Sequence, residues 1–144
     1  IINYYGSDLS GKKIAIWGLA FKPNTDDIRE APALYIIEDL LNAGAEIIAY
    51  DPEGIPNVKQ YFSTLPEDKK VRLHFVEKNY DALKDADFLA ILTEWTEFRT
   101  PDFAKVKSML KDAVIFDGRN LYDLETMKNE GFYYNSIGRK IIQN

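Results

Sequence analysis

The chain has 144 residues, enough for one folded domain, with a net charge of −5, 46% apolar residues, no cysteine and one histidine. This composition excludes disulfides, thiolate metal sites and a cysteine nucleophile, and it argues against histidine-ligated zinc and against sequence-independent binding of nucleic acid. No apolar stretch approaches the roughly 20 residues that cross a bilayer and no secretory signal opens the sequence, so we expect a soluble cytoplasmic protein without a nucleic-acid or membrane partner.

Short apolar runs alternate with segments of helical periodicity in the first half of the chain. Residues 12–18 predict a strand. Residues 32–43 predict a helix, because leucine and isoleucine recur there at spacings of three and four. Gly44 stands where a helix commonly ends in the left-handed conformation. Residues 46–51 predict the next strand, and residues 55–62 a short helix.

The second half of the chain continues the alternation. Its clearest strand is 87–93, an apolar run without polar alternation, as expected for a central parallel strand. Thr100 is predicted to cap a helix whose first residue is Pro101. The remaining expectations are a strand at 71–76, a strand at 113–117, a helix that begins near Leu121 and is stopped by Gly131, and an edge strand at 132–137.

Strands that alternate with helices of about ten to fifteen residues indicate βαβ units and a parallel sheet covered on both faces. We therefore predict an α/β fold, a Rossmann-like three-layer αβα sandwich with a mostly parallel sheet. Residues 11–144 are expected to form this domain. Residues 1–10 do not fit the alternation and are expected to be the end of a connection from an upstream part.

Ligands of open α/β sheets bind beyond the carboxyl ends of the strands, which directs attention to the loops there. The loop after the first strand contains Gly18 but lacks the further glycines of the dinucleotide fingerprint, so a tightly held pyrophosphate is not predicted. It also contains Lys22 and Arg29. A cation next to a helix N-terminus costs roughly 0.3–1 kcal/mol, which makes Arg29 unusual there.

Two interpretations of these cations stay open. In the first, Arg29 pairs with Asp26 or Asp27 and Lys22 is solvated. In the second, Lys22 and Arg29 meet an anionic ligand, and Phe21 leans on a sugar or base or anchors the loop.

A second candidate cation follows the last buried strand. Gly118 permits a sharp turn that presents Arg119 at the carboxyl edge of the sheet. The planar fork of arginine suits phosphate or carboxylate. The alternative is a structural ion pair between Arg119 and Asp117.

Other polar and aromatic residues near these loops are expected to be structural. Trp95 and Phe98 are predicted to pack in the core rather than stack on a ligand. Asp51 ends the second strand, but without the glycine fingerprint a turn or cap role is favoured over ribose binding. His74 is predicted at the surface. Adjacent carboxylates such as Asp26 with Asp27 suggest a solvated face, so no metal site is predicted.

Residues 18–32, which read GLAFKPNTDDIREAP, closely resemble the signature of the C-terminal domain of the UDP-glucose/GDP-mannose dehydrogenases. The resemblance continues through 50–52, 93–98, 116–120 and 136–139 in the order of the family. The Thr-Glu-Trp and Phe-Asp-Gly-Arg segments resemble the UDP-glucose branch more than the mannose or N-acetylmannosamine branches.

The resemblance implies an oxidoreductase that oxidises UDP-glucose to UDP-glucuronate and reduces two molecules of NAD. It implies that Phe21, Lys22 and Arg119 contact the UDP-sugar and that Arg29 faces the NAD. In such enzymes the NAD is bound mainly by an N-terminal domain. A central helical region joins the subunits into a homodimer or a higher assembly. Those two domains and UDP-glucose are therefore the implied partners.

This chain departs from the family in having no cysteine, whereas the covalent mechanism of the family requires a thiolate. We therefore expect an inert lobe without catalytic residues of its own. Three alternatives remain: a lobe of a related GDP-mannose or UDP-N-acetylmannosamine dehydrogenase, a stand-alone nucleotide-sugar binding module, and a purely structural domain.

Overall fold

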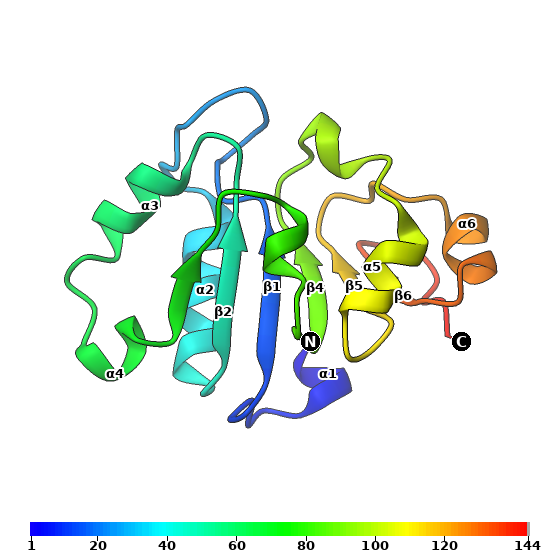
Figure 1. Cartoon of the computed structure of the whole chain (residues 1–144), viewed down its shortest axis with the longest axis horizontal. Helices are drawn as coiled ribbons and strands as arrows, with labels where there is room; N and C mark the ends of the chain where they lie inside the picture. Colours follow the sequence, from blue (N-terminus) through cyan, green and yellow to red (C-terminus); the bar gives the residue numbers. More distant parts are fainter. Residues whose placement is uncertain (144) are drawn as a thin grey trace.

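A single parallel sheet organises the computed structural model, which describes residues 1–143 (Figure 1). The strand order is β3-β2-β1-β4-β5-β6, and every neighbouring pair is parallel. This is the doubly wound order of Rossmann folds, so the predicted fold class is confirmed. The strands are β1 (Lys13–Trp17), β2 (Glu46–Tyr50), β3 (Leu73–Phe75), β4 (Phe88–Ile91), β5 (Val114–Asp117) and β6 (Tyr133–Ser136). The helices are α1 (Ile2–Tyr5), α2 (Pro32–Asn42), α3 (Ile55–Tyr61), α4 (Glu67–Lys70), η1 (Tyr80–Ala82), η2 (Thr96–Phe98), α5 (Phe103–Met109) and α6 (Leu124–Asn129).

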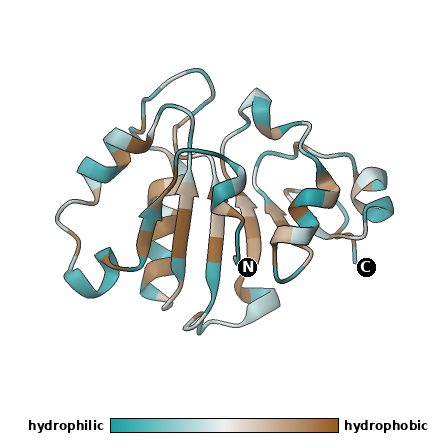
Figure 2. Cartoon of the chain, in the orientation of Figure 1, coloured by the Kyte–Doolittle hydropathy of each residue, from teal (hydrophilic) through white to brown (hydrophobic). Residues whose placement is uncertain are grey.

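The apolar strands separate two core layers, one on each face of the sheet (Figure 2). Alternate residues of a strand point to opposite faces. Ile14 and Ile16 of β1 accordingly pack in the layer that contains the buried side of α2, whereas Ala15 and Trp17 pack in the layer with α5 and α6. Both layers are formed by buried apolar side chains, which explains why these strands show no polar alternation in the sequence.

Most predicted elements lie where the sequence places them, but two helix starts were predicted too early. The helix expected from Thr100 begins at Phe103, because the carboxylate of Asp102 accepts the Lys105 N–H at 3.1 Å and is the true N-cap. The helix expected from Leu121 begins at Leu124. The Leu121 N–H is held instead by the Asp117 carboxylate, at 2.7 Å, which keeps that residue in the preceding turn.

Residues 1–10 pack onto the sheet. The ring of Tyr5 in α1 stacks on Phe88 with centroids 4.6 Å apart, and its hydroxyl donates to Asp112. Leu9 is fully buried, and its N–H donates to the Ala43 carbonyl just beyond α2. This segment therefore closes one side of the core layer that it shares with α2.

The loop after β1 passes very close to the loop after β4, and Gly18 makes that approach possible. Gly18 has φ +100, and a Cβ there would lie 2.5 Å from the Thr93 nitrogen and 2.6 Å from its Cβ. The Thr93 hydroxyl donates to the Ala20 carbonyl at 2.7 Å across the same contact. The two loops are therefore held together at a site where no side chain fits.

We predict that Gly18→Ala is considerably more destabilising than Gly11→Ala. Both positions have positive φ, so both substitutions are strained, but a Cβ at Gly11 meets nothing within 4 Å. The overpacking at Gly18 should add about 1–3 kcal/mol to the loss of unfolding free energy. Urea unfolding of the two variants tests this, and equal losses would show that the close approach is not constraining.

Candidate functional site

A buried carboxylate joins three of the loops at the carboxyl edge of the sheet. Asp51 follows β2 and is 2% exposed. Its Oδ2 accepts N–H bonds from Leu19 at 2.7 Å, Ala20 at 3.0 Å and the Trp95 indole at 3.1 Å. Its Oδ1 accepts the N–H groups of Glu53 and Gly54. With five donors from the chain itself, Asp51 is structural, which confirms the predicted turn or cap role.

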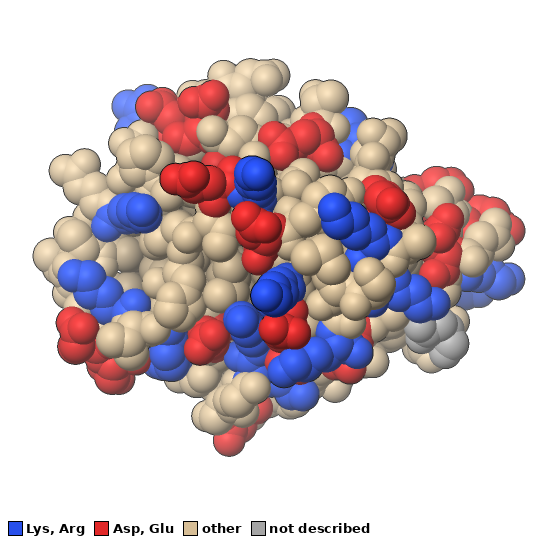
Figure 3. All heavy atoms as spheres, viewed as in Figure 1, with Lys and Arg blue, Asp and Glu red and all other residues tan. Residues whose placement is uncertain are grey.

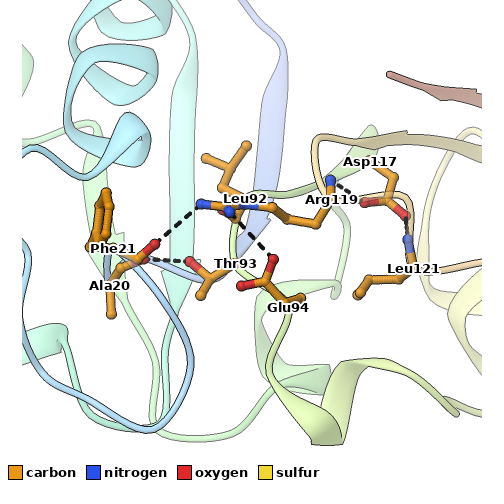
Figure 4. A network of polar contacts seen from close by, with 8 residues as sticks. All are labelled: Ala20, Phe21, Leu92, Thr93, Glu94, Asp117, Arg119 and Leu121. Carbon is orange, nitrogen blue, oxygen red and sulfur yellow. Dashed lines mark hydrogen bonds and ion pairs between the residues drawn. The ribbon is translucent and has the colours of Figure 1, made fainter. Parts of the chain in front are cut away.

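Arg119 lies at the centre of the polar contacts shown in Figure 4. Its Nε donates to the Leu92 carbonyl at 2.9 Å, and one terminal nitrogen donates to the Phe21 carbonyl at 3.2 Å. The other terminal nitrogen forms an ion pair with Glu94 at 3.3 Å. The guanidinium thus connects the loops that follow β1, β4 and β5, and the structure brings Phe21 and Arg119 together as the sequence predicts.

The alternative pairing of Arg119 with Asp117 is wrong for the guanidinium. Asp117 accepts the backbone N–H of Arg119 at 2.8 Å and that of Leu121 at 2.7 Å. Its carboxylate therefore shapes the turn that carries Arg119, while Glu94 is the anion that the side chain meets. Two N–H donors of the guanidinium, one on each terminal nitrogen, make no bond to residues 1–143.

Phe21 and Lys22 both reach solvent next to this cluster. The Phe21 side chain is exposed although its backbone is held, with its N–H bonded to the Asp27 carbonyl at 2.8 Å. Lys22 is exposed and makes no hydrogen bond or ion pair within residues 1–143. Its charge contributes to lowering the pKa of Asp27, but a ligand could approach its ammonium without displacing a hydrogen bond.

Arg29 lies apart from the Arg119 cluster. Its Nε and one terminal nitrogen donate to the two carboxylate oxygens of Asp27 at 3.0 and 2.8 Å, so the pairing offered in the first interpretation is present, with Asp27 as the partner and in bidentate geometry. The side chain is 87% exposed and lines a hollow of about 770 Å³ with Tyr35 and Tyr61. Arg29 is thus paired with Asp27 and still accessible to solvent. It lines a hollow that does not include Arg119.

Trp95, Phe98 and His74 lie as the sequence predicts. Trp95 and Phe98 are buried, with the Phe98 ring stacked on Trp17 at 5.0 Å. His74 is exposed, with its Nε2 4.0 Å from a Glu46 carboxylate oxygen. Within residues 1–143 no cluster of acidic or histidine side chains could hold a metal ion, and no helix there is long and apolar enough to cross a membrane. Acidic and basic side chains are interspersed over the face in Figure 3.

Two features of the site are missed by the sequence reasoning. One is Glu94, which was noted in its loop but not as the partner of Arg119, 25 residues away. The other is the set of contacts that Arg139 makes with the β5 loop through Tyr134 and Tyr122. The pairing of Glu94 with Arg119 and the bond from Arg139 to the Tyr122 carbonyl carry no local signal, because they join segments 25 and 17 residues apart.

Comparison with known sequences gives a consistent result. The profile of the UDP-glucose/GDP-mannose dehydrogenase family, UDP binding domain, matches residues 15–124. A UDP-glucose 6-dehydrogenase of Rhizobium meliloti strain 1021 is 42% identical over 139 residues, covering 96% of this chain and 30% of that protein. Another, of Bacillus subtilis strain 168, is 42% identical over 143 residues, covering 99% and 29%. The chain thus spans about 30% of the length of the curated relatives that it matches.

Solved structures also resemble most of the chain. A UDP-glucose dehydrogenase from Pyrobaculum islandicum superposes with a TM-score of 0.70 at 26% identity, covering 93% of this chain and 27% of that one. A UDP-N-acetyl-mannosamine dehydrogenase from Staphylococcus aureus superposes with a TM-score of 0.61 at 30% identity, covering 91% and 27%.

We predict that Asp51→Asn destabilises the chain strongly. An amide in place of the carboxylate turns an N–H₂ group toward at least two buried N–H donors, and each unsatisfied donor costs about 1–3 kcal/mol. The matched control is Asp26→Asn in the same loop system, where the side chain is exposed and should change stability by less than about 0.5 kcal/mol. Urea unfolding of both variants decides the point, and similar losses would contradict the role of Asp51.

We also predict an acid-sensitive pair at Asp27. Hydrogen bonds from the Arg29 side chain and backbone lower the pKa of Asp27 to about 2. Because the folded pKa lies below the ordinary value near 3.9, the pair is intact above about pH 4 and is lost as the pH falls toward 2. In Arg29→Gln the pKa should rise toward 3.9, whereas Arg99→Gln should not move it. Carboxyl NMR titration measures both, and an unchanged pKa in Arg29→Gln would refute the pairing.

Proposed function

The chain belongs to the UDP-glucose/GDP-mannose dehydrogenase family, and on that premise we propose that it is the lobe that binds the nucleotide-sugar in an NAD-dependent UDP-glucose 6-dehydrogenase. The whole enzyme would oxidise UDP-glucose to UDP-glucuronate in the cytoplasm with reduction of NAD. This chain has no cysteine, so it does not supply the thiolate that the mechanism of the family requires, and its proposed contribution is binding.

The observation that carries this proposal is the state of Arg119. Three protein acceptors orient its guanidinium, yet one donor on each terminal nitrogen stays unused by residues 1–143. The guanidinium therefore keeps donor capacity for an anion, and phosphate oxygens are acceptors that arginine binds well. A diphosphate bound there would also lie at the carboxyl edge of a doubly wound sheet, where ligands of this fold bind.

Phe21 and Lys22 complete the proposed contact surface. Lys22 is exposed and makes no hydrogen bond or ion pair within residues 1–143, although its charge helps to lower the pKa of Asp27, so its ammonium is accessible to the second phosphate or the sugar. Phe21 exposes its ring while its carbonyl receives a bond from Arg119, which places an apolar surface beside the anion site. The nucleotide would be bound by charge at one end and by ring contact at the other.

Arg29 is proposed to serve the cofactor side. It lines a hollow with Tyr35 and Tyr61, separate from the contacts of Arg119, and its side chain is accessible. The glycine fingerprint for a dinucleotide is missing after β1, so the proposed NAD would be held mainly by another domain. The proposed partners are accordingly that domain, the central helical domain and a second copy of the enzyme.

A related nucleotide-sugar is the second candidate. The Staphylococcus aureus UDP-N-acetyl-mannosamine dehydrogenase is 30% identical to this chain, against 42% for the relatives that carry the UDP-glucose 6-dehydrogenase name. The 42% identity to curated relatives supports UDP-glucose, whereas the solved structures of the two kinds of enzyme, at 26% and 30% identity, do not separate the two substrates. The uridine diphosphate is common to both of these substrates, so Arg119 and Lys22 would have the same role in either enzyme.

We predict that the chain binds UDP-glucose weakly, with a dissociation constant of about 1 mM or more. Charge-assisted hydrogen bonds contribute about 1.5–3 kcal/mol each, and association costs about 4–15 kcal/mol, so few exposed cations support only weak binding. Lys22→Gln should weaken binding about tenfold, or 1.4 kcal/mol. The control is Lys84→Gln, an equal charge change just before β4 at the amino edge.

NMR titration with UDP-glucose, UDP and NAD tests this prediction. Shifts should concentrate at residues 21–22 and 118–120 for the uridine ligands, with no saturable shift for NAD. Micromolar affinity for UDP-glucose would instead support a stand-alone binding module. Equal binding by Lys22→Gln and Lys84→Gln would contradict the role of Lys22.

A further inference from the structure

The C-terminal segment folds back against the loop that carries Arg119. The Asn120 side chain donates to the Ile137 carbonyl at 3.0 Å and accepts the Ile137 N–H at 2.8 Å. Asn120 itself has φ +56, a conformation in which asparagine is less strained than most residues. Farther along, Ile142 exchanges two backbone hydrogen bonds with Tyr134. The turn after β5 is thus fastened to the chain that follows β6.

Arg139 makes the densest contacts of this segment. Its Nε donates to the Ser136 hydroxyl at 2.9 Å, Nη1 donates to the Tyr122 carbonyl at 3.0 Å, and Nη2 donates to the Tyr134 hydroxyl at 2.8 Å. All three nitrogens of the guanidinium are therefore engaged, and the group lies 5.5 Å from the centre of the Tyr134 ring. A lysine could not reproduce this planar set of donors.

The contacts of Arg139 lead directly to the base of Arg119. The Tyr134 hydroxyl donates to Oδ2 of Asp117 at 2.6 Å, and Oδ1 of Asp117 accepts the Arg119 N–H at 2.8 Å. Asp117 is 2% exposed, and its carboxylate forms no ion pair within residues 1–143. The guanidinium of Arg139 is connected to that carboxylate through one hydroxyl, that of Tyr134. Burial raises the pKa of Tyr134, which keeps the phenol protonated as the donor.

We propose that Arg139 is a positioning residue that fixes Arg119 for ligand binding through Tyr134 and Asp117. The proposal rests on the proposed function for its ligand, but its structural part concerns only the four residues of this chain. Without Arg139, the Tyr134 hydroxyl oxygen loses the N–H donor that helps to orient it toward Asp117. The Tyr122 carbonyl, at the end of the turn that follows β5, loses its bond from the Arg139 guanidinium. The turn then holds Arg119 less firmly, and the bond from its Nε to the Leu92 carbonyl opens more often.

The test uses the chain labelled with ¹⁵N and follows the Nε–H signal of Arg119, which reports the bond to Leu92. The variants are Arg139→Gln and Arg139→Lys, with Lys140→Gln as the control, because Lys140 is the exposed neighbour in the same segment. Tyr134→Phe removes only the hydroxyl and provides a second way to break the connection. Each variant is also titrated with UDP, and amide signals of β1 to β3 report that the fold is intact.

We expect the Arg119 Nε–H to exchange with water at least tenfold faster in both Arg139 variants and in Tyr134→Phe, and UDP binding to weaken at least fivefold. Lys140→Gln should match the unmodified chain in both readouts. Unchanged Nε–H exchange in the Arg139 variants would overturn the proposal. Slow, unmodified Nε–H exchange in Arg139→Lys alone would also overturn it, because a positive charge without the planar guanidinium would then be sufficient.

The two proposals fail in distinguishable ways. If the unmodified chain does not bind UDP, the proposed function is wrong, whereas the Nε–H exchange still decides whether Arg139 positions Arg119. If UDP binds equally well to all variants while exchange is faster, the ligand role of Arg139 is overturned. A variant that loses the β1 to β3 signals is replaced by Tyr134→Phe, whose ring remains in the core.

Discussion

The carboxyl edge of this domain depends on a single buried carboxylate. Asp51 accepts five N–H bonds from three loops and is itself removed from water, so the loops cannot separate without exposing donors that have no other partner. Gly18 and Thr93 extend the same constraint, because the first and third of these loops meet where no side chain fits. The edge that would receive a ligand is consequently rigid before any ligand arrives.

Rigidity is distributed unevenly among the cations. Arg119 is ordered by Leu92, Glu94 and Phe21, so binding through it incurs little of the roughly 0.5–1.5 kcal/mol that immobilising a long side chain costs. Lys22 makes no hydrogen bond within residues 1–143, so it would bear more of that cost but could adjust to the ligand. In the proposed site, Arg119 would therefore set the orientation of the ligand and Lys22 would accommodate variation in what is bound.

The strands and helices can be predicted well from the sequence, whereas the contacts between the loops that connect them cannot. Buried parallel strands such as β4 are continuous apolar runs, and helices such as α2 repeat their apolar residues with helical spacing, so both have local signals. The exact start of α6 has none, because Leu121 is drawn into the preceding turn by Asp117. Asp51 accepts N–H bonds from Leu19, Ala20 and Trp95, which lie 32, 31 and 44 residues away in the sequence. Only the order of the strands brings these donors to the carboxylate.

The backbone pairing of Ile142 with Tyr134 in β6 affects how readily molecules of this protein associate through the edges of their sheets. An open edge strand offers unpaired backbone groups to any other strand and is a common starting point for aggregation. Here the outward N–H and C=O of Tyr134 in β6 are already bonded to Ile142, and the opposite edge is β3, which is only three residues long. The sheet thus presents no long, unoccupied border within residues 1–143, and neighbouring molecules find little backbone with which to extend it.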